Sequence, residues 1–121
     1  MIDDDRWLCT ELKEVLEREG YHFSYCLAGT EGIAILEKEQ FDLLILDLKL
    51  PGLHGMEIMK KIKRINTHTK ILVFTGSPLN CDISNEKFIQ EEELFRLADA
   101  VLSKSGKMAA MLIKIKEMVL P

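Results

Sequence analysis

The sequence FDLLILD at positions 41 to 47 is the feature that most restricts how this chain can fold. It contains four aliphatic residues in direct succession and ends on Asp47. Runs that do not alternate with polar residues are typical of strands covered on both faces, as in parallel sheets. The run therefore predicts a buried strand whose sheet has helices on both sides.

Helical and strand patterns alternate along the rest of the chain. Apolar residues at helical spacing predict helices over residues 7–19, 30–40, 55–65 and 108–119. Short apolar runs predict further strands over residues 21–28, 70–76 and 99–104. Gly20 is expected to stop the first helix and Thr30 to cap the second. The alternation predicts a flavodoxin-like, doubly wound α/β sandwich of three layers, with a parallel sheet in the order 2-1-3-4-5 and right-handed crossovers.

The beginning of the chain is short for the first strand of such a fold. Only Met1 and Ile2 precede Asp3. The first strand lies inside the sheet, so its omission would leave backbone groups of both neighbours unpaired. We expect either that Met1 lies within this strand and the printed sequence begins late, or that another chain supplies the strand.

Composition excludes several classes of function. The 121 residues are about one domain's worth, and a net charge of -4 lacks the excess of Lys and Arg that nucleic-acid modules carry. No apolar run approaches the ~18 residues of a membrane span, and no basic leader precedes the acidic cluster. The three cysteines have no CxxC spacing, which favours buried free thiols over disulfides or zinc. We expect a cytoplasmic domain, residues 1–121, that binds neither nucleic acid nor membrane.

Polar side chains that could bind a cation or a phosphoryl group follow the predicted strands. They are Asp3, Asp4, Asp5, Asp47, Thr75 and Lys104. The carboxyl ends of parallel strands meet at one edge of a sheet, so we expect these side chains to converge there. Carboxylates within ~5 Å of one another repel and need a cation between them. Mg²⁺ prefers such oxygen ligands, which predicts a magnesium site beside Asp47, with Lys104 and Thr75 placed to contact a phosphoryl group on it.

These residues resemble the receiver domains of two-component response regulators. The resemblance covers nearly the whole chain, through the motifs IDDD, LLILDLKLPGLHGMEIMKKIK, ILVFTGS and ADAVLSKSG. It implies that Asp47 is the phosphoacceptor for a phosphohistidine of a partner histidine kinase or phosphotransfer protein. It also implies that Asp4 and Asp47 bind Mg²⁺ directly, that Asp3 does so through water, and that the backbone carbonyl of Lys49 completes the protein ligands.

The resemblance also implies a switch rather than a conventional enzyme. The phosphoryl group would draw in the hydroxyl of Thr75 and pair with Lys104, shifting the face formed by the fourth helix, fifth strand and fifth helix. Such domains catalyse only their own phosphotransfer and dephosphorylation. The same face would contact an output domain, a partner protein or a second copy, and the chain is expected to be either a stand-alone receiver or part of a larger regulator or hybrid kinase. Asp5 is interpreted as a surface or helix-start charge rather than a ligand.

The sequence departs from the family in three places. Val101 stands where an aromatic residue usually accompanies the threonine, and Ser105 where proline usually follows the lysine. Lys104 follows Thr75 by 29 positions, which is longer than usual, and the excess lies in the acidic segment 78–97. That segment is interpreted as a mobile lid, a partner-binding surface or a long loop.

Two other functions compete with phosphorylation-dependent signalling. One is a phosphorylation-independent interaction or dimerisation module that keeps the receiver fold, which the absent aromatic favours. The other is a hydrolase of the haloacid dehalogenase type, but that class needs a carboxylate two residues after the nucleophile, where Lys49 stands. Among the remaining polar and aromatic residues, His54 is interpreted as a solvated loop residue, and Trp7 either as part of the rim of the site or as ordinary packing.

Overall fold

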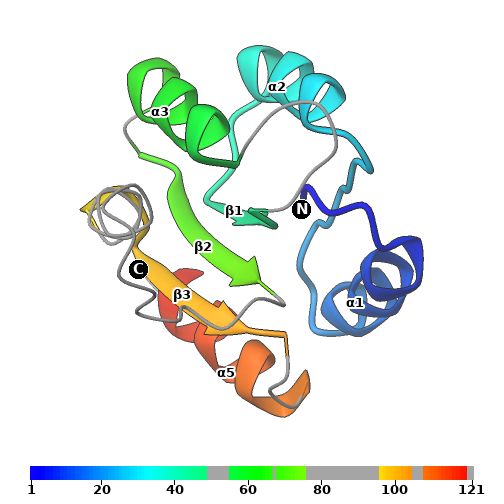
Figure 1. Cartoon of the computed structure of the whole chain (residues 1–121). Helices are drawn as coiled ribbons and strands as arrows, with labels where there is room; N and C mark the ends of the chain where they lie inside the picture. The colour runs from blue at the N-terminus through cyan, green and yellow to red at the C-terminus, as the bar shows by residue number, and fades with distance from the viewer. Residues whose placement is uncertain (49–54, 67, 76–95, 105–107, 120–121) are drawn as a thin grey trace.

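The computed structural model describes residues 1–48, 55–66, 68–75, 96–104 and 108–119. Its helices and strands are α1 (Arg6–Arg18), α2 (Gly29–Lys38), β1 (Leu43–Leu46), α3 (Gly55–Ile65), β2 (Lys70–Thr75), β3 (Ala100–Ser103) and α5 (Met108–Val119) (Figure 1). Each corresponds to an element predicted from the sequence. Among these helices, none combines the length and the apolar character that crossing a bilayer requires.

The strands form a parallel sheet in the order β1-β2-β3. Ile2 extends this sheet, because it makes parallel bridges to both Leu46 and Cys26. Its backbone N–H donates to the carbonyl of Ile45 at 2.8 Å, and its carbonyl accepts from the N–H of Asp47 at 3.0 Å. The order across the sheet is therefore Cys26, Ile2, β1, β2 and β3, which confirms the predicted 2-1-3-4-5 arrangement.

The predicted strand over residues 21–28 forms a β-bridge at Cys26. The N–H of Cys26 donates to the carbonyl of Met1 at 2.9 Å, and its carbonyl accepts from the N–H of Asp3 at 3.1 Å. The carbonyl of Ser24 also accepts from the N-terminal amine of Met1 at 2.8 Å. Among the described residues, the paired part of the predicted short strand is therefore shorter than the range 21–28.

Local capping differs from the prediction at one helix. Asp5 caps α1, and its side chain accepts from the N–H of Leu8 at 3.1 Å, while Gly20 adopts a φ of 90° just past the end of the helix. The predicted cap by Thr30 is wrong. The N-cap is Ala28, two residues before Thr30, and α2 begins at Gly29, because the N–H of Gly32 already donates to the carbonyl of Ala28.

The helices α2 and α3 lie on one side of the sheet and α1 and α5 on the other (Figure 1). A hydrophobic cluster fills the space on each side. Leu44 and Leu46 of β1 pack with the cluster on the side of α2 and α3, while Ile45 packs with the cluster on the side of α1 and α5. Successive residues of a strand point to opposite faces, so a strand that is covered on both sides must be apolar at every position. This confirms the prediction made from the run at positions 41 to 47.

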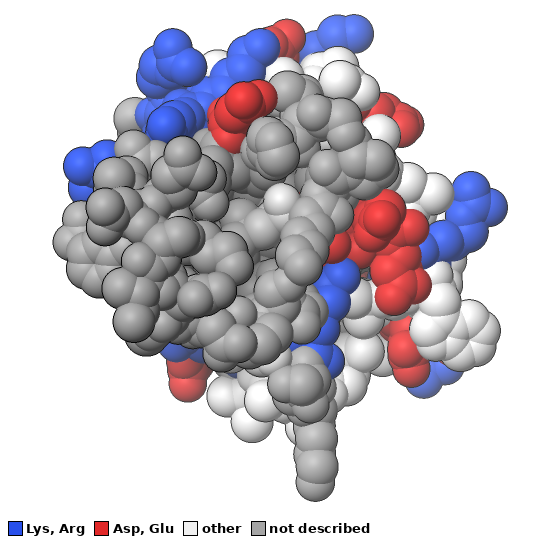
Figure 2. Space-filling view, viewed as in Figure 1, with Lys and Arg blue, Asp and Glu red and all other residues white. Residues whose placement is uncertain are grey.

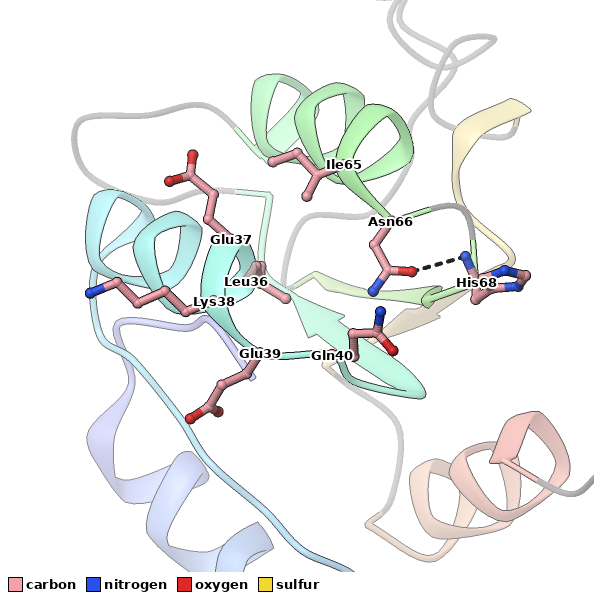
Figure 3. Close-up of a pocket in the computed structure, with 8 residues that line it drawn as sticks. All are labelled: Leu36, Glu37, Lys38, Glu39, Gln40, Ile65, Asn66 and His68. Carbon is pink, nitrogen blue, oxygen red and sulfur yellow. Dashed lines mark hydrogen bonds between the residues drawn. The ribbon is translucent and has the colours of Figure 1, made fainter.

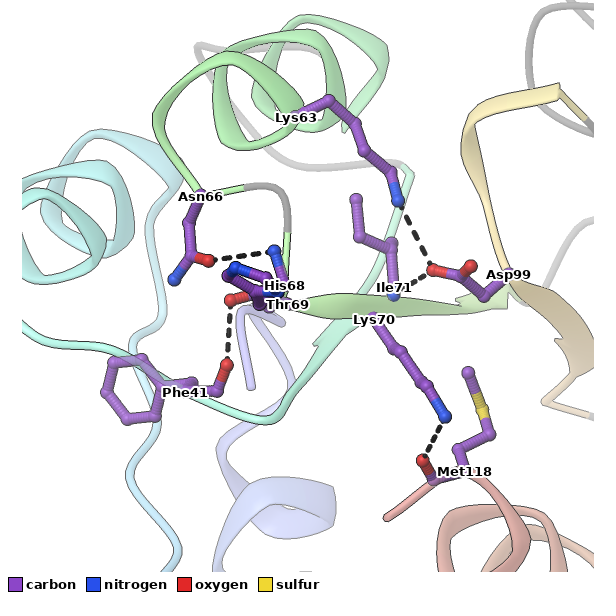
Figure 4. Close-up of polar contacts among 9 residues, drawn as sticks. All are labelled: Phe41, Lys63, Asn66, His68, Thr69, Lys70, Ile71, Asp99 and Met118. Atoms are coloured by element: carbon purple, nitrogen blue, oxygen red, sulfur yellow. Dashed lines mark hydrogen bonds and ion pairs between the residues drawn. The ribbon is translucent and has the colours of Figure 1, made fainter. Parts of the chain in front are cut away.

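Polar contacts at the amino end of the strands fix the start of β3 and the end of α5 (Figure 4). The carboxylate of Asp99 accepts from the backbone N–H of Ile71 at 2.7 Å and from the ammonium of Lys63 at 3.4 Å. The ammonium of Lys70 donates to the carbonyl of Met118 at 2.9 Å. The clustered carboxylates of Asp3, Asp4 and Asp47 lie at the opposite edge of the sheet, at the carboxyl ends of the strands.

Candidate functional site

Three carboxylates meet at the carboxyl edge of the sheet. Asp3 follows Ile2, Asp47 follows β1, and carboxylate oxygens of Asp3, Asp4 and Asp47 all lie within 4.8 Å of one another. Asp3 is 0% exposed and Asp47 5%, whereas Asp4 is exposed. Figure 2 shows acidic side chains gathered on the side of the molecule where the N-terminal segment and α1 lie. The predicted convergence of these three residues is confirmed.

Lys104 brings a positive charge into this group. Its ammonium nitrogen lies 2.8 Å from Oδ2 of Asp3 and donates a hydrogen bond to Oδ2 of Asp47 at 3.1 Å. Burial alone would favour the neutral amine, but the two carboxylates outweigh burial and raise the pKa of Lys104. The lysine therefore stays charged and offsets part of the repulsion between the carboxylates.

Asp3 is the most demanding member of the group. Its Oδ1 accepts from the backbone N–H of Asp5 at 2.9 Å, and its buried Oδ2 has the ammonium of Lys104 at 2.8 Å as its partner. Burial raises the pKa of the Asp3 carboxyl, and Asp47 adds to this, while Lys104 and the N–H of Asp5 oppose it. A buried carboxylate without a partner costs free energy, so Asp3 depends on the positive charge of Lys104.

The donor set fits a hard divalent cation. Its side-chain donors are all carboxylate oxygens, which suit Mg²⁺ and not a soft metal. The exposed side chain of Asp4 leaves one side of the group in contact with solvent, as an ion that retains several water ligands requires. The backbone carbonyl of Lys49, predicted as a further ligand, lies outside the described residues.

Comparison with known proteins identifies the family. The family model described as "Response regulator receiver domain" matches residues 1–116 of the chain. The chain belongs to this family.

Two curated relatives illustrate how the receiver matches them. It is 35% identical to the sporulation initiation phosphotransferase F of Bacillus subtilis over 76 residues, which are 63% of this chain and 61% of that protein. It is 30% identical to the transcriptional regulatory protein CpxR of Escherichia coli over 116 residues, which are 87% of this chain and 49% of that protein. The receiver therefore spans about half to three fifths of the length of these relatives.

Solved structures of receivers have the same fold. The CheY-like receiver domain protein of Methanospirillum hungatei is 32% identical, with a TM-score of 0.82 over 96% of this chain and 87% of that one. The response regulator TrrA of Thermotoga maritima, in complex with Mg²⁺ and BeF, is 25% identical, with a TM-score of 0.80 over 98% of this chain and 95% of that one. The flavodoxin-like α/β fold predicted from the sequence is confirmed.

Other predicted residues of the receiver have different outcomes. Thr75 ends β2, where its backbone pairs with Ser103, but its side chain is outside what the structure describes. Asp5 caps α1 and is not among the three clustered carboxylates, in line with the prediction. Val101 is half-buried in β3 and packs against the cluster on the side of α2 and α3. His54, Ser105 and most of the segment 78–97 lie outside the described residues.

Two aromatic residues remain to be placed. Trp7 is 77% exposed, so the first of its two interpretations, as part of the rim of the site, stays a prediction, whereas ordinary packing is wrong: the buried face of α1 is made by Cys9, Leu12 and Leu16. Sequence reasoning also missed Phe74, whose ring centroid lies 5.9 Å from the ammonium nitrogen of Lys104. The signal was the parallel register, in which Phe74 is paired with Leu102, two positions before Lys104 and therefore on the same face.

The thiols near the site are unreactive by burial. Cys9 and Cys26 are buried and free, as predicted, and the Sγ of Cys9 donates to the carbonyl of Asp3 at 3.7 Å. Burial raises the pKa of the Cys9 thiol to about 11 and also raises that of Cys26. Since the thiolate is the reactive form, neither thiol is suited to nucleophilic chemistry at neutral pH.

A pocket of about 280 Å³ lies at the C-terminal ends of α2 and α3, away from the cluster of Asp3, Asp4 and Asp47 (Figure 3). Leu36 and Ile65 provide its apolar wall, and Gln40 and Asn66 its amide groups. The side chain of Asn66 already accepts from the backbone N–H of His68 at 3.0 Å. The pocket contains none of the residues predicted for phosphoryl chemistry.

Proposed function

We propose that this receiver accepts a phosphoryl group on Asp47 from a phosphohistidine of a sensor histidine kinase or phosphotransfer protein, in an Mg²⁺-dependent reaction. The observation that carries the proposal is the position of the Asp47 carboxylate. It lies at the tip of a rigid buried strand, within 4.8 Å of two other carboxylates and 3.1 Å from the ammonium of Lys104. A nucleophile held at a fixed point beside a cation site is what phosphoryl transfer requires.

The proposed transfer moves one phosphoryl group from nitrogen to oxygen. One oxygen of Asp47 forms a bond to phosphorus while the bond between phosphorus and the histidine nitrogen of the donor breaks. The electron pair of the broken bond stays on the imidazole. The product is an acyl phosphate, whose later hydrolysis by water returns the carboxylate and inorganic phosphate.

The chain's own residues have distinct roles in this proposal. Asp4 and Asp47 would hold Mg²⁺ directly, Asp3 would hold it through water, and the carbonyl of Lys49 would complete the set. The bound ion would supply positive charge against the phosphoryl oxygens. Lys104 pairs with a phosphoryl oxygen once it is released from the carboxylates, and the hydroxyl of Thr75 donates to another.

The switch is proposed to act through β3. Val101 packs against the cluster on the side of α2 and α3, while Leu102 packs against the cluster on the side of α1 and α5. Lys104 follows this strand directly, so a new partner for its ammonium shifts a segment that touches both layers. The absent aromatic at Val101 leaves this backbone route as the means of output.

The cellular setting follows from the same proposal. CpxR is named a transcriptional regulatory protein and is longer than the matched region. We propose that this receiver is a single domain, including the segment 78–97, that acts in the cytoplasm on an output domain, a partner protein or a second copy through the face containing β3 and α5. It dephosphorylates itself and has no other enzymatic activity.

A second candidate is a phosphorylation-independent interaction module. It is favoured by Val101, and the ion pairs of Lys104 are compatible with it because they offset part of the charge of Asp3 and Asp47. The two candidates differ in whether binding of a phosphoryl group at Asp47 changes the conformation of β3.

The deciding experiment is a titration with Mg²⁺ and then with beryllofluoride, a stable phosphoryl mimic. The readouts are the fluorescence of Trp7, the single tryptophan, and the backbone amide shifts of β3. We expect both ligands to bind the wild type, the mimic to shift the amides of Ala100–Ser103, and Asp47→Asn to lose the mimic. The matched control is Asp42→Asn, an exposed carboxylate just before β1, which should leave binding unchanged. Binding without a shift in β3 would favour the second candidate, and no response to Mg²⁺ would rule out the metal site.

A further inference from the structure

We infer that Phe74 is a positioning residue for Lys104. Its ring holds the ammonium group beside the carboxylates of Asp3 and Asp47, from which the group can pass to a phosphoryl oxygen. The inference rests on the proposed function for its second half, the passage to the phosphoryl group. The contact between the ring and the ammonium stands independently of that function.

The position of the ring is fixed by packing. Phe74 is 5% exposed and belongs to the cluster that joins the sheet to α1 and α5. Its backbone is paired with Leu102 in the parallel ladder between β2 and β3. Lys104 follows β3 directly, two positions after Leu102, and its ammonium lies over the ring on this same face. The ring therefore cannot move away from the ammonium without disturbing the core.

The charge distribution around the ammonium is unequal. On one side it meets Asp3 at 2.8 Å and Asp47 at 3.1 Å. On another side the ring of Phe74 lies with its centroid 5.9 Å from the nitrogen. The negative face of an aromatic ring attracts a cation, and more strongly where water is excluded. The side chain of Lys104 is only 23% exposed, so this attraction is little screened by solvent.

The ring differs from a polar neighbour in a way that suits a moving charge. A hydrogen-bond acceptor at this position would fix the ammonium in one orientation, and its bond would have to break when the lysine changes partners. The attraction of a ring depends weakly on the direction of the N–H bonds, so the ammonium can turn from Asp3 to a new oxygen while it remains over the ring. An aliphatic side chain of similar volume would keep the core filled but would lose this attraction.

The test separates the electrostatic role from simple packing. Phe74 is replaced by pentafluorophenylalanine, which keeps the shape of the ring but removes its negative face, and by leucine. The matched control is pentafluorophenylalanine at Phe23, which packs against the same cluster and lies over no cation of the described residues. The fluorinated variants preserve volume, so the test does not depend on whether Phe74→Leu folds.

Two readouts are measured on each variant. The first is the proton shift of the ε-methylene of Lys104 in the metal-free protein, which a neighbouring ring moves upfield. We expect this upfield shift in the wild type and its loss in Phe74→Leu. The second is the affinity for beryllofluoride at saturating Mg²⁺. In the metal-free protein Asp3 and Asp47 hold the ammonium even without the ring, so the attraction of the ring counts most once the ammonium has changed partners. We therefore expect the affinity to fall about 3- to 10-fold when the face of the ring at Phe74 is fluorinated and to stay unchanged for the control at Phe23.

The outcomes distinguish this inference from the proposed function. Equal affinity for beryllofluoride in the wild type and the variant fluorinated at Phe74 would overturn the positioning role. Absence of an upfield shift of the Lys104 ε-methylene in the wild type would overturn the contact itself. If the wild type bound no beryllofluoride, the proposed function and the passage of Lys104 to a phosphoryl group would fail together, while the methylene shift would still decide whether Phe74 holds the ammonium.

Discussion

The ammonium nitrogen of Lys104 lies 2.8 Å from Oδ2 of Asp3, a side chain that is fully buried. The same nitrogen contacts Asp47, so one lysine serves two carboxylates. One monovalent cation cannot neutralise three clustered carboxylates, and the remaining repulsion is stored in the fold. The cluster of Asp3, Asp4 and Asp47, which suits a divalent cation, is therefore also a source of instability for the metal-free protein.

Replacing Asp3 by asparagine should stabilise the metal-free protein at neutral pH, by about 1 kcal/mol or more, because it removes a buried charge and its repulsion with Asp47. The pKa of Asp3 is raised above its ordinary value. Because folding raises this pKa, the protonated Asp3 side chain stabilises the folded protein. This stabilisation is present in full below the ordinary pKa of aspartate and is lost as the pH rises through the pKa of Asp3 in the folded protein. Urea unfolding across acidic and neutral pH measures this, and the gain should shrink in acid.

The control for Asp3→Asn is Asp42→Asn, which removes an exposed carboxylate and should change the free energy of unfolding little at any pH. A loss of stability in Asp3→Asn at neutral pH would show that the ion pair with Lys104 outweighs the repulsion.

Mg²⁺ should raise the thermal stability of the wild type, since a ligand that binds only the folded state stabilises it. The gain is ~2.7 kcal/mol at a free concentration of a hundred times the dissociation constant. Differential scanning calorimetry with Mg²⁺, and after chelation, measures the effect. The same Mg²⁺ concentration should have little effect on Asp47→Asn. An equal gain in that variant would place the ion elsewhere.

The run of Leu44, Ile45 and Leu46 predicts the sheet because burial on both faces leaves a strand no position for a polar residue. The strand ends then locate Asp3, Asp47 and Lys104, since parallel strands share one edge. Local details escape such reasoning. Thr30 is a good capping residue, but the N-cap of α2 is Ala28, so a favourable residue type alone does not decide where a helix begins.

The exposure of Trp7 and the place of Phe74 escape for a related reason. Both are large aromatic residues, and the sequence pattern does not say which one faces the core. Trp7 lies on the solvent side of α1, whereas Phe74 sits in β2 against α1 and α5. The position of the Phe74 ring under Lys104 depends on the register between β2 and β3, which is a relation between distant segments.

Replacing Gly32 by alanine should destabilise the protein by about 1–3 kcal/mol, despite the better helix propensity of alanine. A Cβ at this position would lie 2.7 Å from Cγ1 of Ile2, which is buried in the core between its two neighbours in the sheet. Ile2 also directly precedes Asp3, so the substitution should weaken Mg²⁺ binding. Ala34 lies exposed on the same helix, and Ala34→Gly serves as the control, with a loss of about 1 kcal/mol and unchanged Mg²⁺ affinity.

The stability of the wild type should fall as the pH rises from about 9 to about 11. The lower value is the ordinary pKa of a thiol, and the upper one is the pKa to which burial raises Cys9 in the folded protein. The unfolded chain loses this proton first, so the loss through Cys9 is at most ~3 kcal/mol. Urea unfolding at a series of alkaline pH values measures the slope. Cys9→Ala should flatten it, and Thr10→Ala, an exposed neighbour on α1, should not. Identical slopes in wild type and Cys9→Ala would assign the alkaline loss to other groups.

Replacing Asp99 by alanine should destabilise the protein by about 1–3 kcal/mol, because it leaves the N–H of Ile71 without its acceptor. Ile71 is 0% exposed, so water is a poor replacement. Asp99 also pairs with Lys63, but that contact is 3.4 Å long and partly solvated, so Lys63→Ala should cost less than about 1 kcal/mol. Urea unfolding of the two variants separates the buried hydrogen bond from the ion pair. Asp99→Asn keeps an acceptor and should fall between them, and equal losses in Asp99→Ala and Lys63→Ala would instead assign the stabilisation to the ion pair.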